Sequence, residues 1–600
     1  MAKTIINKNG SSKVDVIEIT KKVTVKAFSG NDKVTVKKGS GAIVYGGAGS
    51  DKIYVNAGSS QKIYGEAGAD TITIGKSTGS GLRVYGGNTK YTLTDKDSFV
   101  INGGTKNYFY GGKGMDTFTI NAGTSNNFYG NAGVDTFYLN GGKSNNLYSG
   151  IGNDVFVIGK YSTGTAFVKD FNIRKGEADK IKVTGGTVKS IKASGSNLII
   201  TGGKSASLTL VNAKGKSLSI TDSRGSFTVS NTAITLGNNF TGSLNTSVLL
   251  PTTIKTVSGT DKADNITVSG GSGKRVFTRK GADTILVTSG KSHTIYSGAN
   301  NDTITIKGGT EVEVFADTGA DKIYINGGSG HGINSGDGDD KIFINAGSDH
   351  FIVKHGSSVA KGNDYVEINK GAGDNINISA FNGMLDGNET IVVNGGNKHW
   401  IQLGNNGEQV VTINSGNEHE VRLTGNALDK AKVTVNGGTN NHIVCEGSSS
   451  NTAYDINVLK GEGHKVDVSF IDTNGTNITV AAKNVSLDLG NYNKANHVIV
   501  QWSDNIGTLA IDSVHDFDET GVANALTISG ATSNDFTFSK FQDYMYLEGY
   551  GNFPSSLGLS VDSVNSDCHI KISNWWNQPF SGITFDNGEL LSYTEINSKL

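Results

Sequence analysis

The chain has 600 residues, with 83 glycines, three prolines and nearly balanced charge, 54 Lys and Arg against 55 Asp and Glu. High glycine content without proline excludes collagen and is typical of many tight turns joined by strands. Balanced charge gives no sign, on net charge alone, of nucleic acid or an anionic membrane surface as a partner. Two cysteines, Cys445 and Cys568, are too few for a disulfide framework or a cysteine zinc site.

The sequence shows neither a transmembrane helix nor an N-terminal signal peptide. No stretch approaches the roughly 18 apolar residues of a transmembrane helix, so we expect no membrane-spanning segment. The N-terminal residues MAKTIINKNGSSKVDV lack the apolar centre of a Sec-type signal peptide. We therefore expect a protein that is either cytoplasmic or exported by a route that does not read the N-terminus.

An aspartate recurs every 19 residues, each time at the end of a glycine-rich turn and before a short strand. After Asp116, the alternation Thr-Phe-Thr-Ile of residues 117–120 places Phe and Ile on one face, as in a half-buried strand. Each repeat holds two turns and two strands, which predicts an all-β, right-handed parallel β-roll or β-solenoid with coils about 4.8 Å apart. The aspartates are Asp32, Asp51, Asp70, Asp116, Asp135 and Asp154 in a first block, and Asp264, Asp283, Asp302, Asp321 and Asp340 in a second.

The other turn of each repeat carries an Asn-x-Gly or similar pattern. Asparagines stacked at one position of successive coils predict a ladder of side-chain hydrogen bonds, which is a structural role. The members are Asn56, Asn102, Asn121, Asn140, Asn326, Asn345, Asn394, Asn414 and Asn436.

The aspartate turns resemble a known family. GGAGSDKIY at 46–54 and GGKGMDTFT at 111–119 closely fit the nonapeptide G-G-x-G-x-D-x-U-x, where U is a large apolar residue. GEAGADTIT, GNAGVDTFY and SGDGDDKIF are near matches, whereas GTDKADNIT and the turn before Asp283 are degenerate. Over roughly residues 25–185 and 255–370 the chain is therefore similar to RTX proteins, which carry haemolysin-type calcium-binding repeats.

The resemblance implies Ca²⁺ held between successive turns by loop carbonyls and by the carboxylates of two stacked coils, a set of hard oxygens that suits this ion. In the family both edges carry the motif, whereas here the Asn-x-Gly edge has none, so we expect calcium along one edge only. The candidate ligands are the eleven aspartates above with Gly46, Gly47, Gly49, Gly65, Gly68, Gly111, Gly112, Gly114, Gly130, Gly133, Gly150, Gly152, Gly298, Gly319, Gly336 and Gly338.

Carboxylates stacked about 5 Å apart repel each other by about 1–3 kcal/mol, so a calcium-free chain should be loose and ion binding should be coupled to folding. Extracellular calcium modules bind at about 10⁻⁴–10⁻³ M, which predicts folding outside the cell. The alternative is a calcium-free solenoid whose aspartates cap their own turns.

We divide the chain into five segments. Residues 1–185 are the first calcium β-roll, 186–254 a β-rich capping segment and 255–380 the second calcium β-roll. Residues 381–510 continue the solenoid with few ions, because they keep the Asn-x-Gly turns and lose the aspartates. Residues 511–600 are a C-terminal module.

The C-terminal segment has a resemblance of its own. Residues 566–600 contain an I-x-N-W pattern and a later I-x-F-x-x-G pattern, and they resemble the haemolysin-related C-terminal segment. In that family the end of the chain holds an uncleaved type I secretion signal. The resemblance implies an extracellular protein that engages a type I secretion apparatus and is then either released or retained at the cell surface.

Catalytic motifs are absent from this sequence. His419-Glu420 is followed at the fifth position by Leu423, so it is not a zinc-protease HExxH motif. Residues 75–79 match G-x-S-x-G, but they lie between coils and not at a strand-to-helix elbow. All eleven histidines fall at or after His293. We expect that the protein is not an enzyme.

Two further columns are candidates for binding. His331, His350, His399 and His419 follow the Asn-x-Gly-type turns at the position that Gln61, Asn107, Asn126 and Asn145 take in the first roll. They form either a polar ladder or a transition-metal site of stacked imidazoles. Tyr45, Tyr64, Tyr110, Tyr129 and Tyr148 precede the glycine turns, where they either pack against the turns or offer a stacking surface to a glycan.

These observations predict a secreted calcium-binding RTX repeat protein with a structural or adhesive role at a bacterial surface. Its partners would be calcium ions and a cell-surface glycan or another surface protein. The alternative is an RTX toxin, or an enzyme-associated RTX protein, with an unrecognised active region within 381–560.

Overall fold

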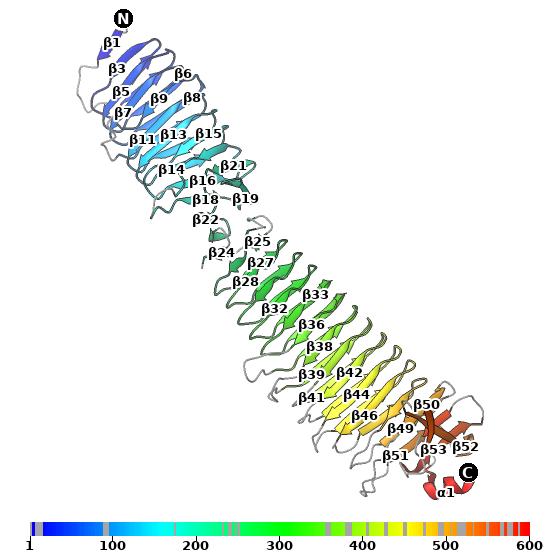
Figure 1. The fold of residues 1–600 in the computed structure, drawn as a ribbon. Helices are drawn as coiled ribbons and strands as arrows, with labels where there is room; N and C mark the ends of the chain where they lie inside the picture. The colour runs from blue at the N-terminus through cyan, green and yellow to red at the C-terminus, as the bar shows by residue number, and fades with distance from the viewer. Residues whose placement is uncertain are drawn as a thin grey trace. The chain divides into compact units, whose positions relative to one another are not determined.

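A computed structural model describes residues 3–6, 16–87, 95–172, 176–230, 233–237, 240, 243–246, 249, 253–353, 362–378, 387–403, 407–424, 430–447, 453–471, 476–489, 497–503, 506–512, 524–531, 533–547, 551–564, 569–572, 580–585 and 588–600. The chain is 58% strand and 2% helix and forms a parallel β-solenoid of about 21 turns. The predicted solenoid fold is confirmed. Its contacts divide into two compact units, Met1–Ser269 and Gly270–Leu600, shown from blue to red in Figure 1.

In the first unit, alternate strands belong to two parallel sheets, so each coil contributes one strand to each sheet. One sheet contains β1 (Lys3–Ile6), β3 (Val23–Lys26), β5 (Ile43–Ala48), β7 (Lys62–Ala67), β9 (Arg83–Tyr85), β11 (Tyr108–Lys113), β13 (Asn127–Ala132), β15 (Asn145–Tyr148) and β17 (Thr165–Val168). The other contains β2 (Val16–Ile19), β4 (Lys33–Val36), β6 (Lys52–Gly58), β8 (Thr71–Thr78), β10 (Ser98–Ile101), β12 (Thr117–Ile120), β14 (Thr136–Leu139), β16 (Val155–Gly159) and β18 (Lys180–Thr184).

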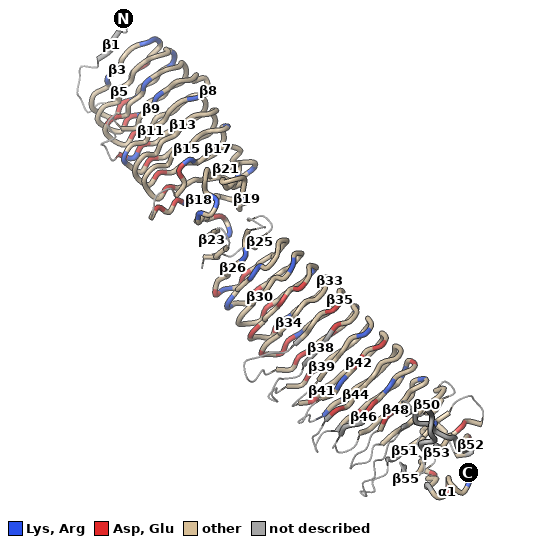
Figure 2. The backbone as a smooth tube through the Cα atoms, viewed as in Figure 1, with Lys and Arg blue, Asp and Glu red and all other residues tan. Residues whose placement is uncertain are grey.

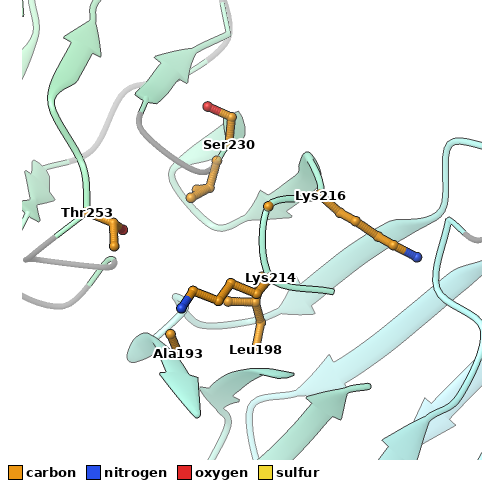
Figure 3. A pocket seen from close by; sticks show the side chains of 8 residues that line it. Ala193, Leu198, Lys214, Lys216, Ser230 and Thr253 are labelled. Carbon is orange, nitrogen blue, oxygen red and sulfur yellow. The ribbon is translucent and has the colours of Figure 1, made fainter. Parts of the chain in front are cut away.

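The segment after these coils mixes antiparallel and parallel pairs, as expected for a cap on a solenoid end. Its strands are β19 (Ser190–Ser194), β20 (Asn197–Gly202), β21 (Ala206–Leu210), β22 (Leu218–Asp222), β23 (Gly225–Val229) and β24 (Ala233–Leu236), and the unit ends with β25 (Ser243–Asn245), β26 (Thr256–Ser258) and β27 (Asn265–Val268). A cavity in this segment is lined by Leu198, Lys214, Lys216 and Val229, among others (Figure 3). Its volume of about 10 Å³ is at the lower limit for one water molecule.

The second unit repeats the two-sheet arrangement. One sheet contains β28 (Arg275–Phe277), β30 (Thr294–Tyr296), β32 (Glu313–Phe315), β34 (Gly332–Asn334), β36 (Phe351–Val353), β38 (Asn375–Ile378), β40 (Trp400–Leu403), β42 (Glu420–Thr424), β44 (His442–Gly447), β46 (Lys465–Ile471), β48 (Ser486–Asp488) and β50 (Thr508–Asp512). The other contains β29 (Thr284–Val287), β31 (Thr303–Ile306), β33 (Lys322–Ser329), β35 (Lys341–Ser348), β37 (Tyr365–Ile368), β39 (Glu389–Val393), β41 (Glu408–Ile413), β43 (Lys430–Val435), β45 (Ala453–Val458), β47 (Thr476–Val480), β49 (His497–Gln501) and β51 (Asn524–Ser529).

An antiparallel segment ends the chain. It contains the 3₁₀ helix η2 (Ser533–Asp535), β52 (Phe536–Leu547), β53 (Gly551–Ser563), β54 (His569–Ile572), β55 (Phe580–Phe585), β56 (Leu590–Ser592) and α1 (Tyr593–Lys599). Ser592 and Glu595 form a capping box at the start of α1. Most of the predicted I-x-N-W motif lies outside the described residues. No helix in the described part of the chain is long and apolar enough to cross a membrane.

The core consists of the alternate apolar side chains that each strand turns inward. In β12, Phe118 and Ile120 are fully buried while Thr117 and Thr119 are only partly covered, as the sequence pattern predicts. The rings of Phe118 and Phe137 stack at a centroid distance of 4.9 Å in successive coils. Because each coil repeats the same inward residues, side chains stack on their equivalents, and polar side chains that point inward stack in the same way.

Candidate metal centre

The aspartates that end the glycine-rich turns form an inward column in the first unit. The backbone N–H of each aspartate donates to Oδ1 of the aspartate in the next coil, with N–O distances of 2.7–2.9 Å. Each of these residues is at most 3% exposed. The column consists of Asp32, Asp51, Asp70, Asp97, Asp116, Asp135, Asp154 and Asp179.

The second unit contains an equivalent column with the same N–H to carboxylate bonds at 2.7–2.9 Å. Its members are Asp283, Asp302, Asp321, Asp340, Asp364 and Glu389. Asp283 belongs to it although its turn departs from the glycine motif. At Asp264, Oδ2 accepts the N–H of Thr260 at 2.7 Å within its own turn. At Asp264 the structure therefore favours the turn-capping alternative.

Four members of the columns were missed by the 19-residue spacing: Asp97, Asp179, Asp364 and Glu389. Each lies 24–27 residues after the previous member. Insertions lengthen the loops without changing the coil, so the column continues in space while the spacing changes in sequence. An aspartate directly before an alternating strand, as in Asp97-Ser-Phe-Val-Ile, is the local signal that could have found three of the four.

The glycines shape the turns around this column. Gly47 and Gly49, four and two residues before Asp51, have φ of 114° and 131°, a region that disfavours other residues. The predicted site glycines with the same left-handed backbone are Gly68, Gly112, Gly133, Gly150, Gly152, Gly298, Gly319, Gly336 and Gly338. Gly114 is not left-handed, but a Cβ there would overlap the Asp95 carbonyl oxygen.

At eight members of the two columns the second carboxylate oxygen has no hydrogen-bond donor among the described residues. This holds for the buried Oδ2 of Asp51, Asp70, Asp116, Asp135, Asp154, Asp302, Asp321 and Asp340. In the well-formed turns this oxygen lies beside a carbonyl oxygen of the next coil. A Cβ on Gly65 would overlap both Asp70 Oδ2 and the Gly86 carbonyl oxygen, and a Cβ on Gly130 would overlap Asp135 Oδ2 and the Ser149 carbonyl oxygen.

Gly46 and Gly111 lie in the same way beside the Oδ2 of Asp51 and Asp116 and a carbonyl oxygen of the following coil. Two hydrogen-bond acceptors therefore face each other in a buried space, an arrangement that requires a cation, a proton or a bridging water molecule between them. In Figure 2 the acidic positions of the first unit gather along one edge.

Burial raises the pKa of these carboxyl groups. Loss of solvation is the largest cause, the backbone N–H bonds oppose it, and neighbouring aspartates add to it. The pKa reaches about 9 at Asp70 and about 8 at Asp135 and Asp340. It is about 7 at Asp321 and about 6 at Asp116. Ionised carboxylates on this edge therefore need a compensating positive charge.

The opposite edge also carries a column of inward side chains. Where each aspartate has a second oxygen, these side chains have a nitrogen. Oδ1 of Asn126 accepts the N–H of Asn107 at 2.9 Å, and its Nδ2 donates to the Gly104 carbonyl. Nδ1 of His331 accepts the N–H of Val312, and its Nε2 lies 3.1 Å from the Gly327 carbonyl oxygen. The inner atom accepts in both columns, but here the outer atom is a nitrogen. At most positions a turn carbonyl oxygen lies within hydrogen-bond distance of this nitrogen, whereas Nε2 of His350 and of His419 has no partner among the described residues. The side chains with such outer-atom bonds are Gln61, Asn107, Asn126, Asn145, Lys274, His293, His331, His399, Asn441 and His464.

The predicted histidine column is part of this ladder. The rings of His331 and His350 stack at 4.9 Å, and those of His399 and His419 at 4.8 Å. Burial lowers the pKa of His331 and of His419 to about 4, so these rings are neutral at pH 7. Both nitrogens of His331 are used by backbone groups, which favours the polar ladder over a transition-metal site. The column also contains Asp374, which the sequence did not place on this edge.

The outer asparagines of this edge form the predicted side-chain ladder. Nδ2 of Asn121 donates to Oδ1 of Asn102 at 2.9 Å, and Asn140 repeats the bond to Asn121. In the second unit the ladder runs without interruption through Asn326, Asn345, Asn369, Asn394, Asn414 and Asn436.

The tyrosine column also stacks ring on ring. Tyr45, Tyr64 and Tyr85 lie at centroid distances of 4.9 Å with planes 10–12° apart, and Tyr110, Tyr129 and Tyr148 continue the stack. Each ring face is covered by the ring of the next coil, which favours the packing interpretation.

Within the described part of the chain, no three His, Cys, Asp or Glu side chains converge as a metal-ligand group. A metal site on the aspartate edge would thus depend on carbonyl oxygens together with one carboxylate oxygen per coil, a set of hard ligands that suits Ca²⁺ better than Zn²⁺. No protein-family model matches this chain, and no curated protein sequence matches it.

Proposed function

We propose that the aspartate edge binds several Ca²⁺ ions through the Oδ2 atoms of its column and the carbonyl oxygens of the glycine turns. The observation that carries this proposal is the buried Oδ2 without a donor at eight turns. The opposite edge, with the same coil geometry, supplies a donor at the equivalent place. Hard oxygens on flexible glycine loops are the ligands that Ca²⁺ accepts.

The contacts of each carboxylate decide how many oxygen ligands it offers to an ion. Oδ1 is already used by a backbone N–H, so one carboxylate oxygen per coil remains for an ion. This differs from the expectation that two whole carboxylates share each ion. We assign no calcium ligand to Asp264, because Thr260 already donates to its Oδ2.

The proposed role is that of a secreted structural or adhesive protein at a bacterial surface, which folds when it meets extracellular calcium. Buried carboxylates without a cation destabilise the folded chain, so calcium binding is coupled to folding. The C-terminal resemblance to RTX proteins supports export by a type I apparatus. We propose no catalytic activity. The strands described from β39 to β50 continue the solenoid through most of the region where an activity was the alternative.

A calcium titration of the full-length protein tests the proposal. Circular dichroism and calorimetry in EGTA and in millimolar CaCl₂ should show a large gain in strand signal and melting temperature with calcium, and a smaller gain with Mg²⁺, which requires a stricter octahedral geometry. Native mass spectrometry should then count several bound ions. Identical melting temperatures in EGTA and in calcium would contradict the proposal.

A further inference from the structure

Histidine is confined to the second unit of the chain. All eleven histidines lie between His293 and His569, so Met1–Ser269 contains none. In the inward column of the Asn-x-Gly edge, the first unit uses amide side chains such as Asn126, which do not titrate. Histidines occupy this column only in the second unit, and imidazole changes its charge near neutral pH. The histidines of the column are His293, His331, His350, His399, His419 and His464.

The backbone decides which ring nitrogen of these histidines carries the proton. Nδ1 of His331 accepts the N–H of Val312 at 3.2 Å, and Nδ1 of His419 accepts the N–H of His399 at 3.3 Å. The neutral ring therefore carries its proton on Nε2. A second proton would have to bind Nδ1, where it would meet the N–H that now donates to that nitrogen. Protonation of either ring thus breaks a hydrogen bond between two coils.

The surroundings of His331 and His419 offer little compensation for a charged ring. Both side chains are fully buried. Each stacks on one other imidazole, His331 on His350 and His419 on His399, at centroid distances of 4.9 and 4.8 Å. The carboxyl group of the column, Asp374, contacts His350 and His399, so it lies one coil further from the other two rings.

Other titratable side chains near the two rings lie outside the column and are exposed or partly exposed. Several of them pair with one another, as Glu311 does with Lys291 and Glu418 with Lys398. The set, taken from the neighbouring positions and the adjoining coils, is Lys291, Glu311, Glu313, Asp349, Lys398, Glu418, Glu420, Arg422 and His442.

Burial lowers the pKa of His331 and of His419 from 6.5 to about 4. Because the unfolded chain binds the proton more tightly, each neutral ring contributes a stability that is complete above pH 6.5 and is lost as the pH falls towards 4. At pH 5 each ring should lower the folding equilibrium constant about thirtyfold.

We propose that the histidine column is an acid-sensitive device that opens the second unit at mildly acidic pH, a response that the first unit lacks because amides occupy its column. The inference goes beyond calcium binding and does not depend on it, since these rings lie on the edge opposite to the aspartates. Acid also protonates the aspartate column. The test therefore compares histidine variants with the wild type at the same pH and the same calcium concentration.

Tryptophan fluorescence can follow the second unit within the full-length protein. All four tryptophans, Trp400, Trp502, Trp575 and Trp576, belong to Gly270–Leu600. Urea unfolding of wild type, His331→Asn and His419→Asn is measured at pH 7.5 and pH 5 in millimolar CaCl₂. Relative to either variant, the unfolding constant of the wild type should rise about thirtyfold between the two pH values.

The matched control is His497→Asn. His497 lies outside the column, partly buried on β49, with its Nε2 3.1 Å from Thr527 Oγ1. This variant should respond to acid as the wild type does. Circular dichroism at pH 7.5 checks that each variant is folded, and His331→Gln, with the side chain that the first unit carries at Gln61, replaces His331→Asn if the latter loses strand signal.

Equal acid responses of the wild type and both column variants would overturn the inference, and so would a control that loses its acid response as the column variants do. Failure of the calcium proposal is seen separately, as a melting temperature that does not respond to EGTA, and it leaves the comparison between variants intact.

Discussion

Replacing Asp135 by asparagine should stabilise the calcium-free protein. In the column, Oδ1 of Asp135 accepts the N–H of Asp116 at 2.8 Å, while Oδ2 lies beside the Ser149 carbonyl and has no donor among the described residues. Asparagine keeps the acceptor and places a donor next to that carbonyl, as Asn126 does on the opposite edge. The substitution therefore gives this coil of the aspartate edge the outer hydrogen-bond donor that asparagine supplies on the opposite edge.

The magnitude follows from the pKa of Asp135, which burial raises from 3.8 to about 8. Between pH 3.8 and pH 7 the folded protein keeps this carboxyl protonated while the unfolded chain ionises it, at about 1.4 kcal/mol per pH unit. The penalty at pH 7 is about 4 kcal/mol, and asparagine removes it. At a calcium concentration of 100 times Kd, one site adds about 2.7 kcal/mol to the wild type, and the variant loses this gain at each site that uses Asp135.

The assay is calorimetric or denaturant unfolding of wild type and Asp135→Asn in EGTA and in calcium at pH 7. The variant should be more stable in EGTA, and its advantage should shrink in calcium. The reciprocal control is Asn126→Asp, which places a second acceptor next to the Gly104 carbonyl and should cost about 1–3 kcal/mol at pH 7. If Asp135→Asn is less stable than wild type in EGTA, the argument that Oδ2 lacks a partner is wrong.

Three other predictions follow from the same geometry. In EGTA the melting temperature should fall as the pH rises from 5 to 9. The raised pKa values of Asp70 and Asp135 give a stability that is complete below pH 3.8 and is lost as the pH rises through 8 and 9. Saturating calcium should reduce the slope, and a melting temperature that rises with pH in calorimetry would contradict the prediction. Gly130→Ala should cost about 1–3 kcal/mol and lower the calcium count in native mass spectrometry, because its Cβ meets Asp135 Oδ2 and the Ser149 carbonyl. Gly186→Ala, where a Cβ meets nothing within 4 Å, should stay within about 0.5 kcal/mol, and equal losses at the two glycines would contradict the role of the Cβ overlap at Gly130. In urea unfolding, His331→Asn should preserve the free energy of unfolding, whereas His331→Leu should lower it by about 1–3 kcal/mol. The reason is that only leucine leaves the Gly327 carbonyl without a donor. Equal stability of the two variants would contradict the hydrogen-bonding role of His331 in the ladder.

The period of the sequence was enough to predict the solenoid and most of its aspartate edge. Alternation after Asp116 identified the buried faces of Phe118 and Ile120, because a strand side chain has only two directions. The constant spacing then placed equivalent residues one above the other. Both patterns can be recognised from neighbouring residues or from a constant spacing, so neither prediction requires knowledge of long-range contacts.

The remainder of the site depends on three-dimensional register. Asp179 and Asp364 belong to the columns because the strands after them pair with the previous coil, although loops of different length separate them in sequence. Asp264 fits the spacing but accepts a donor from Thr260 in its own turn, a contact that depends on the loop conformation.

The two edges of the solenoid differ in how they complete the same hydrogen-bond pattern. In both, the inner side-chain atom accepts a backbone N–H from the preceding coil, and the outer atom faces turn carbonyls. Asparagines such as Asn126 and histidines such as His331 complete the pattern within the chain. Asp374 is the exception among the described residues of the donor edge. Its Oδ1 accepts the N–H of His350, and its own N–H donates to Nδ1 of His399. Because that nitrogen is an acceptor, Oδ2 of Asp374 is left without a donor, like Oδ2 of Asp70, Asp135 and Asp321 on the aspartate edge. A carboxylate at either edge therefore lacks the outer donor that asparagine and histidine supply. The aspartate edge repeats this arrangement at coil after coil, and this repetition is why we propose that ions from the solvent supply its positive charge.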